Sequence, residues 1–152
     1  MLALVPAGFV VMILLGALAV DNAVVYLGQR QVHDALVAAA NDAVDASVDN
    51  GAFYRQGRIV LDFQRVADTA CASVLAQHMS DVRDLHLWVS TGGDAVRLQA
   101  TAEVGTVFGR AIPGFGERTV HASASASLAS GPGGQGESPV PAGDDPAFVP
   151  CG

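Results

Sequence analysis

The chain has 152 residues, and its 15 acidic and 8 basic side chains give a formal net charge of −7 at pH 7. All of the basic residues are Arg, and they are scattered along the chain. Binding to nucleic acid needs grouped positive charge to contact the phosphates, so this composition argues against a nucleic-acid partner. The length fits one small domain.

The most distinctive feature is the first stretch, residues 1–20, in which no side chain is charged. An α-helix of this length spans roughly the 30 Å hydrocarbon core of a bilayer, since each residue adds about 1.5 Å. We therefore predict a transmembrane anchor. Asp21 follows it, and we interpret this residue as a charge at the membrane interface rather than a buried contact between helices. The acidic remainder is more easily placed outside, so we expect a single-pass protein of the cell membrane with residues 21–152 outside the cytoplasm.

Two alternatives to an anchor stay open. Ala17-Leu18-Ala19 fits the small-residue pattern of a signal-peptidase site, so residues 1–19 are also a candidate for a cleaved signal peptide. The basic residues that normally precede the apolar run of a signal peptide are absent, unless a short basic leader lies upstream of Met1. The second alternative is a buried core helix, although a chain of this size rarely hides a helix that is apolar on every side.

The helix is predicted to continue without a break from the anchor through residues 21–50, where it becomes amphipathic. Asp49, Asn50 and Gly51 are expected to end it, because Asn and Gly adopt the left-handed geometry of a helix C-cap. The apolar face of this segment consists of Val25, Val32, Leu36, Ala39 and Ala43.

Residues 52–57 are predicted to form an irregular connector, and residues 58–61 a short strand. Asp62 is a candidate N-cap, since its carboxylate can accept hydrogen bonds from the first amides of a new helix. That helix is predicted to run from Phe63 to about Met79. Its apolar face consists of Phe63, Val66, Ala67, Ala70, Val74 and Leu75.

Three later segments alternate between apolar and polar side chains, which is the pattern of a strand with one buried face. Residues 84–90 and 95–104 are joined by a Gly-rich turn and are predicted to form a hairpin. After a Gly-rich loop at 105–116, residues 119–128 alternate mainly between Ala and Ser and are predicted to form a third strand. The predicted fold class is therefore α+β: a long N-terminal helix, a short strand, a helix and a three-stranded antiparallel sheet whose apolar face is covered by the two helices.

The residues from Ser130 onward are rich in Gly and Pro and contain almost no apolar pairing, so we predict a disordered tail. The predicted organisation thus has four parts: a transmembrane anchor at 1–20, an extracytoplasmic continuation of the helix at 21–50, a small α+β domain at 51–129 and the tail at 130–152.

No catalytic or cofactor-binding motif is recognisable. The sequence lacks a nucleophile elbow, a phosphate-binding loop and a dinucleotide-binding fingerprint, so we predict neither an enzyme nor a cofactor. The histidines do not have the spacing of metal ligands, and no metal site is predicted. His86 and His121 fall on the polar faces of their strands, where exposure to solvent is expected. The full set is His33, His78, His86 and His121.

Cys71 and Cys151 are the only two cysteines. Outside the cytoplasm they could form a disulfide that ties the end of the tail to a helix. Cys71 also lies beside the apolar face of its predicted helix, where a free buried thiol is ordinary. Both alternatives stay open.

Residues 4–44 resemble the start of the TadE/TadG-like membrane proteins of bacterial tight-adherence (Tad, Flp-type) pilus systems. In that family an apolar span ends in an Asp and continues as a helix with an aromatic residue, an Arg–Gln pair and an Ala-rich segment that contains Asp. Residues 51–62 also look like the connector and strand of actinobacterial-type members. The corresponding positions of the helix are Val20-Asp21, Tyr26, Arg30-Gln31 and Ala39-Ala40-Asn41-Asp42-Ala43.

The resemblance implies a non-catalytic, minor pilin-like component in the assembly of a Tad/Flp-type pilus or a related secretion apparatus. Pilins cut by a prepilin peptidase carry a Gly and then a Glu early in the apolar helix; the first Glu here is Glu103, so such processing is not expected. The implied partners are the membrane and other pilin-like or platform membrane proteins of the assembly system. The alternative is a membrane-tethered extracytoplasmic binding or envelope domain unrelated to pili. Small residues that would permit close packing against other helices are Ala7, Gly8, Gly16, Ala17 and Ala23.

Overall fold

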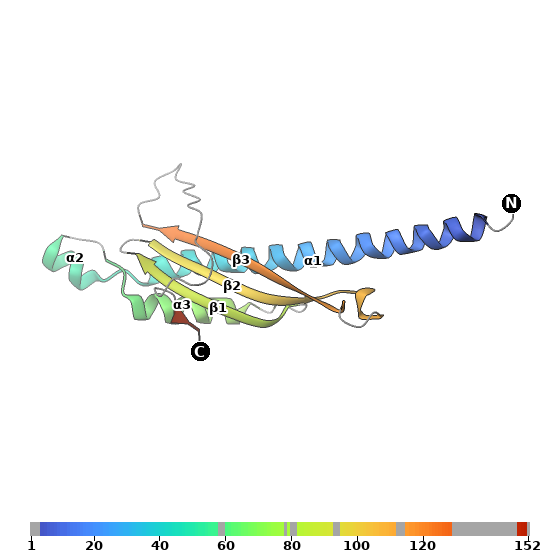
Figure 1. Cartoon of the computed structure of the whole chain (residues 1–152). Coiled ribbons are helices and arrows are strands. Elements are labelled where there is room, and N and C mark those ends of the chain that lie inside the picture. The colour runs from blue at the N-terminus through green and yellow to red at the C-terminus, as the bar shows by residue number, and fades with distance from the viewer. Residues whose placement is uncertain are drawn as a thin grey trace.

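A computed structural model describes residues 4–57, 60–77, 79, 82–92, 95–111, 115–128 and 149–151 of the chain. The dominant element is helix α1, Leu4–Ala46, whose 43 residues correspond to a length of about 65 Å. Figure 1 shows that α1 is continuous: its N-terminal half extends alone, and its C-terminal half lies against a small domain. The predicted long N-terminal helix is confirmed.

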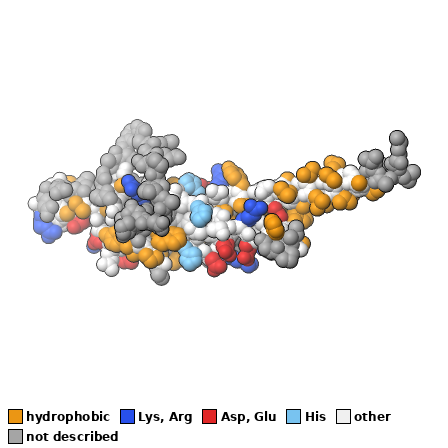
Figure 2. All heavy atoms as spheres, in the orientation of Figure 1, with side chains coloured by type: hydrophobic (Ala, Val, Ile, Leu, Met, Phe, Trp, Pro, Cys, Tyr) orange, Lys and Arg blue, Asp and Glu red, His pale blue; other side chains and the backbone are white. Residues whose placement is uncertain are grey.

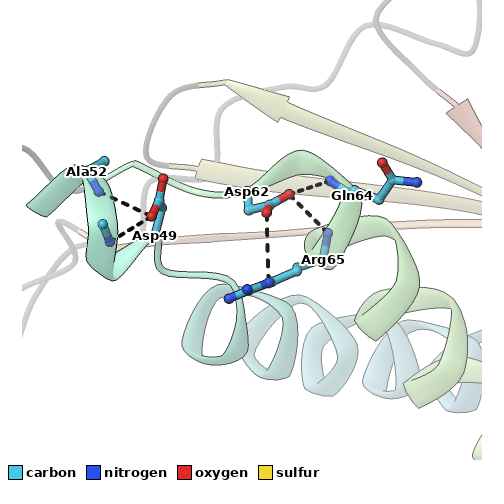
Figure 3. A network of polar contacts seen from close by, with 6 residues as sticks. Asp49, Ala52, Asp62, Gln64 and Arg65 are labelled. Atoms are coloured by element: carbon cyan, nitrogen blue, oxygen red, sulfur yellow. Dashed lines mark hydrogen bonds and ion pairs between the residues drawn. The ribbon is translucent and has the colours of Figure 1, made fainter.

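α1 ends at Ala46, and a short second helix, α2 (Asn50–Gln56), takes the place of the predicted connector. Asp49 has an extended backbone (φ −79°, ψ 94°), and its Oδ1 accepts hydrogen bonds from the amides of Gly51 at 2.8 Å and Ala52 at 3.2 Å (Figure 3). The left-handed C-cap expected at this point is therefore wrong. The carboxylate of Asp49 satisfies the first free amides of a helix, so this sequence starts a helix instead of ending one.

The strand predicted over residues 58–61 is reduced to a single bridge within the part of the chain that the structure describes. Residues 58 and 59 lie outside the described residues, and Leu61 forms an isolated antiparallel bridge with Val48. Two backbone hydrogen bonds of 2.9 Å support this bridge. The amide of Asp49 donates to the carbonyl of Val60, and the amide of Asp62 donates to the carbonyl of Ser47. This bridge holds the segment beside the end of α1.

Helix α3, Phe63–Ala76, starts as predicted at the N-cap Asp62. Asp62 Oδ1 accepts hydrogen bonds from the amides of Gln64 at 3.0 Å and Arg65 at 3.4 Å (Figure 3). It ends before the predicted Met79, because Gln77 adopts an extended backbone (φ −82°, ψ 109°). The buried side chains of α3 are Val66, Ala70 and Val74, whereas Phe63 and Leu75, which we had placed on this face, are exposed.

Within the described residues, the sheet contains four antiparallel strands in the spatial order β3-β2-β1-β4. The predicted hairpin consists of β1 (Val82–Gly92) and β2 (Ala95–Gly105), and the predicted Ala/Ser strand is β3 (Glu117–Ser127). Each is slightly longer than its predicted segment. The fold class is α+β, as expected, with one strand more than the predicted three.

The extra strand is β4, Val149–Pro150, which comes from the predicted disordered tail. It pairs with Trp88 and Val89 of β1, and the amide of Cys151 donates to the carbonyl of Leu87 at 2.9 Å. The prediction of disorder is therefore wrong for residues 149–151. The remainder of the tail lies outside the described residues.

One face of the sheet is buried beneath α1, which packs on β2 and β3, and α3, which packs against β1 and α1 (Figure 1). The Oγ of Ser73 on α3 donates to Asp42 Oδ2 on α1 at 2.8 Å, so the two helices are also joined by a polar contact. The predicted apolar face of β2 is confirmed residue by residue: Val96, Leu98, Ala100, Ala102 and Val104 are all buried. The same buried core cluster contains, from α1, Val32, Leu36, Ala39, Ala40, Ala43 and Val44.

Candidate functional site

The free half of α1, residues 6–20, is exposed along almost its whole length, with only Ala17 half-buried. Large apolar side chains such as Phe9, Met12 and Leu15 are 65–73% exposed. The helix is long and apolar enough to cross a membrane, and its apolar window is not buried anywhere within the protein. A helix buried in the core, one of the alternatives left by the sequence, is therefore wrong.

The small residues predicted to pack against other helices do not form one stripe. Because each helical residue rotates by about 100°, Gly16 and Ala23 lie on one side of α1 with Gly8 near them, whereas Ala7 and Ala17 lie on the side that continues toward the domain. A Cβ added at Gly8 or Gly16 would meet nothing within 4 Å. The side of α1 carrying Gly16 and Ala23 is thus open and opposite the sheet.

α1 makes a contact with the domain at Asp21, directly after the apolar stretch. We call the described residues between β2 and β3, 106–111 and 115–116, the junction loop. Asp21 Oδ1 accepts hydrogen bonds from the amides of Val107 and Phe108, both at 2.8 Å, and its Oδ2 accepts from the amide of Gly109 at 2.7 Å. Gly109 starts the short 3₁₀ helix η1, Gly109–Ala111. The side chain that the sequence analysis interprets as a simple interface charge therefore fastens the end of the domain nearest the free half of α1 to that helix.

Three amide donors favour the charged form of this carboxyl group, which lies just beyond the apolar stretch. The amide of Phe108 has the largest effect in holding the pKa of Asp21 below its ordinary value of 3.8. The amides of Gly109 and Val107 and the positive charge of Arg118 act in the same direction, and partial loss of solvent opposes them. Asp21 is consequently an anionic acceptor at neutral pH.

The junction loop is also closed on itself. Thr106, which is buried, donates from Oγ1 to the carbonyls of Phe115 at 2.9 Å and Gly116 at 3.2 Å, and its amide donates to the Gly116 carbonyl at 2.9 Å. A Cβ at Gly109 would overlap the Phe115 carbonyl oxygen and the Thr106 hydroxyl. Glycine is therefore required there for the two sides of the loop to meet.

Among the described residues of the junction loop, the exposed side chains are mainly apolar, with Arg110 as the charged exception. Val107, Phe108 and Phe115 are 55%, 50% and 57% exposed. In Figure 1 this loop is the part of the domain nearest to the free half of α1.

Sequence reasoning did not find this junction, although α1 contained a signal for it. Asp21, Gly28 and Ala35 are spaced by seven residues, so they lie on one side of the helix, and Gly28 and Ala35 are both buried against the domain. An Asp in register with a domain-facing stripe is expected to meet the domain. Its partners could not be inferred, because they are 86 to 88 residues away in the sequence.

The two cysteines are brought together. Cys71 of α3 and Cys151, next to β4, form a disulfide with a Cα–Cα distance of 5.9 Å, which is one of the two alternatives that the sequence left open. The disulfide fixes Cys151 and the neighbouring β4 to α3, one of the two helices that cover the sheet.

The three histidines that the structure describes are not gathered into a site. His86 and His121 are exposed on the outer face of the sheet, as expected, and His121 Nδ1 lies 3.1 Å from the hydroxyl of Thr101. His33 is exposed on α1, and His78 lies outside the described residues. In the described ranges, no group of three His, Cys, Asp or Glu side chains could hold a metal ion.

The arrangement consists of three parts: the exposed apolar half of α1, the carboxylate of Asp21 directly after it, and a small domain whose junction loop binds that carboxylate through three backbone amides. Comparisons of the chain with protein-family models, with curated proteins and with solved structures gave no match.

Proposed function

We propose that this protein is a non-catalytic, minor pilin-like membrane component in the assembly of a Tad/Flp-type pilus or a related secretion apparatus. The observation that carries the proposal is a single unbroken helix that is bare and apolar along residues 6–20 and packed on an α+β domain from Val24 onward. Such a helix can lie among other membrane helices while its domain makes contacts outside. The choice of apparatus rests on the resemblance of residues 4–44 to TadE/TadG-like proteins.

The disulfide supports placing the domain outside the cytoplasm. Disulfides persist in oxidising compartments and are rare in the reducing cytosol. Cys71 and Cys151 are joined across 80 residues of sequence, so the bond is part of the folded domain and not a contact within one loop. In the proposed topology, α1 crosses the membrane once and residues 21–152 face the oxidising side.

The open side of α1 is the proposed contact with partner helices. Small residues let two membrane helices approach closely, and Gly16 and Ala23 lie on the side opposite the sheet. A partner helix can therefore pack there without meeting the domain. Large apolar side chains such as Leu14 lie on the other side of the same helix, in line with Asp21 and Gly28, which face the domain further along α1.

Photo-crosslinking in the host bacterium tests this proposal. A photoreactive amino acid at Met12, beside the Gly16 side, should crosslink to another pilin-like or platform membrane protein. The same amino acid at Leu14, two residues away and on the other side of α1, is the matched control and should crosslink much less. The substitution Gly16→Leu should abolish the Met12 crosslink by preventing close approach, and deletion of the gene should reduce the number of surface filaments.

Two results would contradict the proposal. Equal crosslinking from Met12 and Leu14 would mean that no particular side of α1 is recognised. Normal filaments in the deletion strain, together with no crosslink to an assembly protein, would reject the pilus role. A membrane-tethered extracytoplasmic binding domain would then be the better account.

A further inference from the structure

We infer that the junction loop is a second membrane contact, in which Val107, Phe108 and Phe115 enter the interfacial region of the bilayer beside α1. This inference rests on the proposed function in one respect, namely that the free half of α1 lies in a membrane. It adds that the domain itself touches the lipid. The ligand is the boundary between the headgroups and acyl chains of the membrane that holds α1.

The first argument is position. Asp21 binds the amides of Val107, Phe108 and Gly109 at 2.7–2.8 Å, so the backbone of the loop is level with the first charged residue after the apolar stretch. If residues up to Val20 occupy the hydrocarbon core, that level is the membrane interface. Apolar side chains of interfacial segments enter roughly 5–10 Å at this boundary.

The second argument is the exposure of the apolar side chains. Val107, Phe108 and Phe115 are each at least half exposed and lie outside the buried core cluster. Figure 2 shows hydrophobic side chains along the free half of α1 and again beside its entry into the domain. The exposed apolar side chains of the loop thus belong to a segment that lies beside the end of the free half of α1.

The third argument is that the loop can enter an apolar environment at low cost. Unpaired backbone groups are strongly unfavourable near hydrocarbon. Here the amides of residues 107–109 are bound by Asp21, and the carbonyls of Phe115 and Gly116 are bound by Thr106. These backbone groups therefore have partners within the protein, while three large apolar side chains of the loop are exposed together with the side chain of Arg110.

A water-facing contact with another protein is the competing occupant of this surface. The bilayer is favoured because a helix that crosses it passes within hydrogen-bonding distance of the loop, so no additional partner is required. The chain is acidic overall, and the contact therefore depends on apolar insertion more than on attraction to anionic headgroups.

Fluorescence quenching by bilayer lipids tests the inference on the full chain. Trp88 is the only tryptophan, so Trp88→Phe gives a background without fluorescence from Trp. In this background, Phe108→Trp is reconstituted into phosphatidylcholine vesicles whose acyl chains are brominated near the headgroup. Leu14→Trp reports on the anchor, and Tyr54→Trp, at an 84% exposed position on α2, reports on the far end of the domain.

We expect Phe108→Trp to lose fluorescence in brominated vesicles as Leu14→Trp does, while Tyr54→Trp keeps its fluorescence. Addition of Asp21→Ala should reduce the loss at Phe108→Trp, because the loop is no longer held at the interface. Formation of the Cys71–Cys151 disulfide in each variant, measured by mass, verifies that the domain has folded.

The contradicting results separate this inference from the proposed function. If Leu14→Trp is quenched and Phe108→Trp is not, the anchor is in the membrane but the loop faces water, and the inference is overturned in favour of a protein contact. If neither is quenched, the membrane location of α1 fails, and both proposals fail with it. Quenching of Tyr54→Trp to the same extent would show that the domain lies flat on the bilayer, which also overturns a contact restricted to the loop.

Discussion

α1 approaches β2 closely at Gly28, and this contact gives a sharp prediction of the packing. An ideal Cβ at Gly28 would lie 2.7 and 2.8 Å from the two γ-methyl groups of Val104 on β2. Val104 is fully buried, and its branched side chain cannot turn both methyl groups away at once. To restore a 3.4 Å contact, α1 would have to move by about 0.7 Å from the sheet.

Two opposing effects determine the outcome of Gly28→Ala. Replacement of Gly by Ala within a helix is favourable by roughly 0.5–1 kcal/mol, because Gly loses more backbone freedom on folding. Overpacking of a close-packed core costs about 1–3 kcal/mol. We expect the steric cost to exceed the gain and the free energy of unfolding to fall by about 1–2 kcal/mol.

Denaturant unfolding of the full chain in detergent micelles, followed by Trp88 fluorescence, measures this change. Val104→Ala is also expected to destabilise, by roughly 1–3 kcal/mol, because it leaves a cavity. In the double variant, the new methyl group at Gly28 occupies part of that cavity, so the two losses should not add. We expect a favourable coupling of about 0.5–3 kcal/mol.

The control is Gly16→Ala, where the added Cβ meets nothing within 4 Å and the domain should unfold as before. Additive losses in the Gly28→Ala, Val104→Ala double variant would refute the proposed contact between these two residues. So would an increase in stability from Gly28→Ala alone, since it would mean that α1 lies farther from β2.

Three further predictions follow from the domain. Leu98→Asp should unfold the domain, because Leu98 is fully buried and the carboxylate would lose several kcal/mol of hydration. The control is Arg97→Asp, since Arg97 is exposed on the other face of β2, and it should change the free energy of unfolding by less than about 0.5 kcal/mol. Equal effects of the two substitutions would contradict the strand register. Replacement of both Cys71 and Cys151 by Ser should lower the free energy of unfolding by about 2–4 kcal/mol. The stability of this double variant should equal that of the native chain after its disulfide is reduced. An unchanged denaturation midpoint would contradict a disulfide in the folded protein. The contribution of the Asp21 carboxylate to the free energy of unfolding should be present above its ordinary pKa of 3.8 and lost as pH falls through the lower pKa of the folded state. NMR titration of the three amide protons bound to Asp21 should therefore have a midpoint below 3.8. A midpoint above that value would contradict the hydrogen bonds between Asp21 and the junction loop.

The features predictable from sequence are those encoded by local chemistry. Alternation along residues 95–104 predicts the buried face of β2, because a slip of one residue would turn every apolar side chain to solvent. Asp62 predicts the start of α3, since an N-cap acts on amides only two and three residues away. The long apolar run predicts α1 for a similar reason: its helical character needs no distant partner.

The features that were missed depend on contacts distant in sequence or on a choice between two local signals. Asp49 can belong to the end of one helix or the start of another, and the bridge between Val48 and Leu61 favours the second by holding the chain extended after Ala46. β4 has only two residues, and its place follows from pairing with β1 and from the disulfide at Cys151. Neither contact is visible in the composition of the Gly/Pro-rich tail.

The hydrogen bonds of Asp21 to the junction loop limit how the free half of α1 can move relative to the domain. A flexible tether would need a break in helical structure between the apolar stretch and the domain, yet α1 is helical on both sides of Asp21. Bending at this point would have to disrupt helix hydrogen bonds and also remove Asp21 from three amides of the junction loop. The sheet therefore has to follow any tilt or rotation of α1. In the proposed assembly, packing of a partner helix at Gly16 and Ala23 would set not only the position of α1 but also the direction in which the outer face of the sheet points.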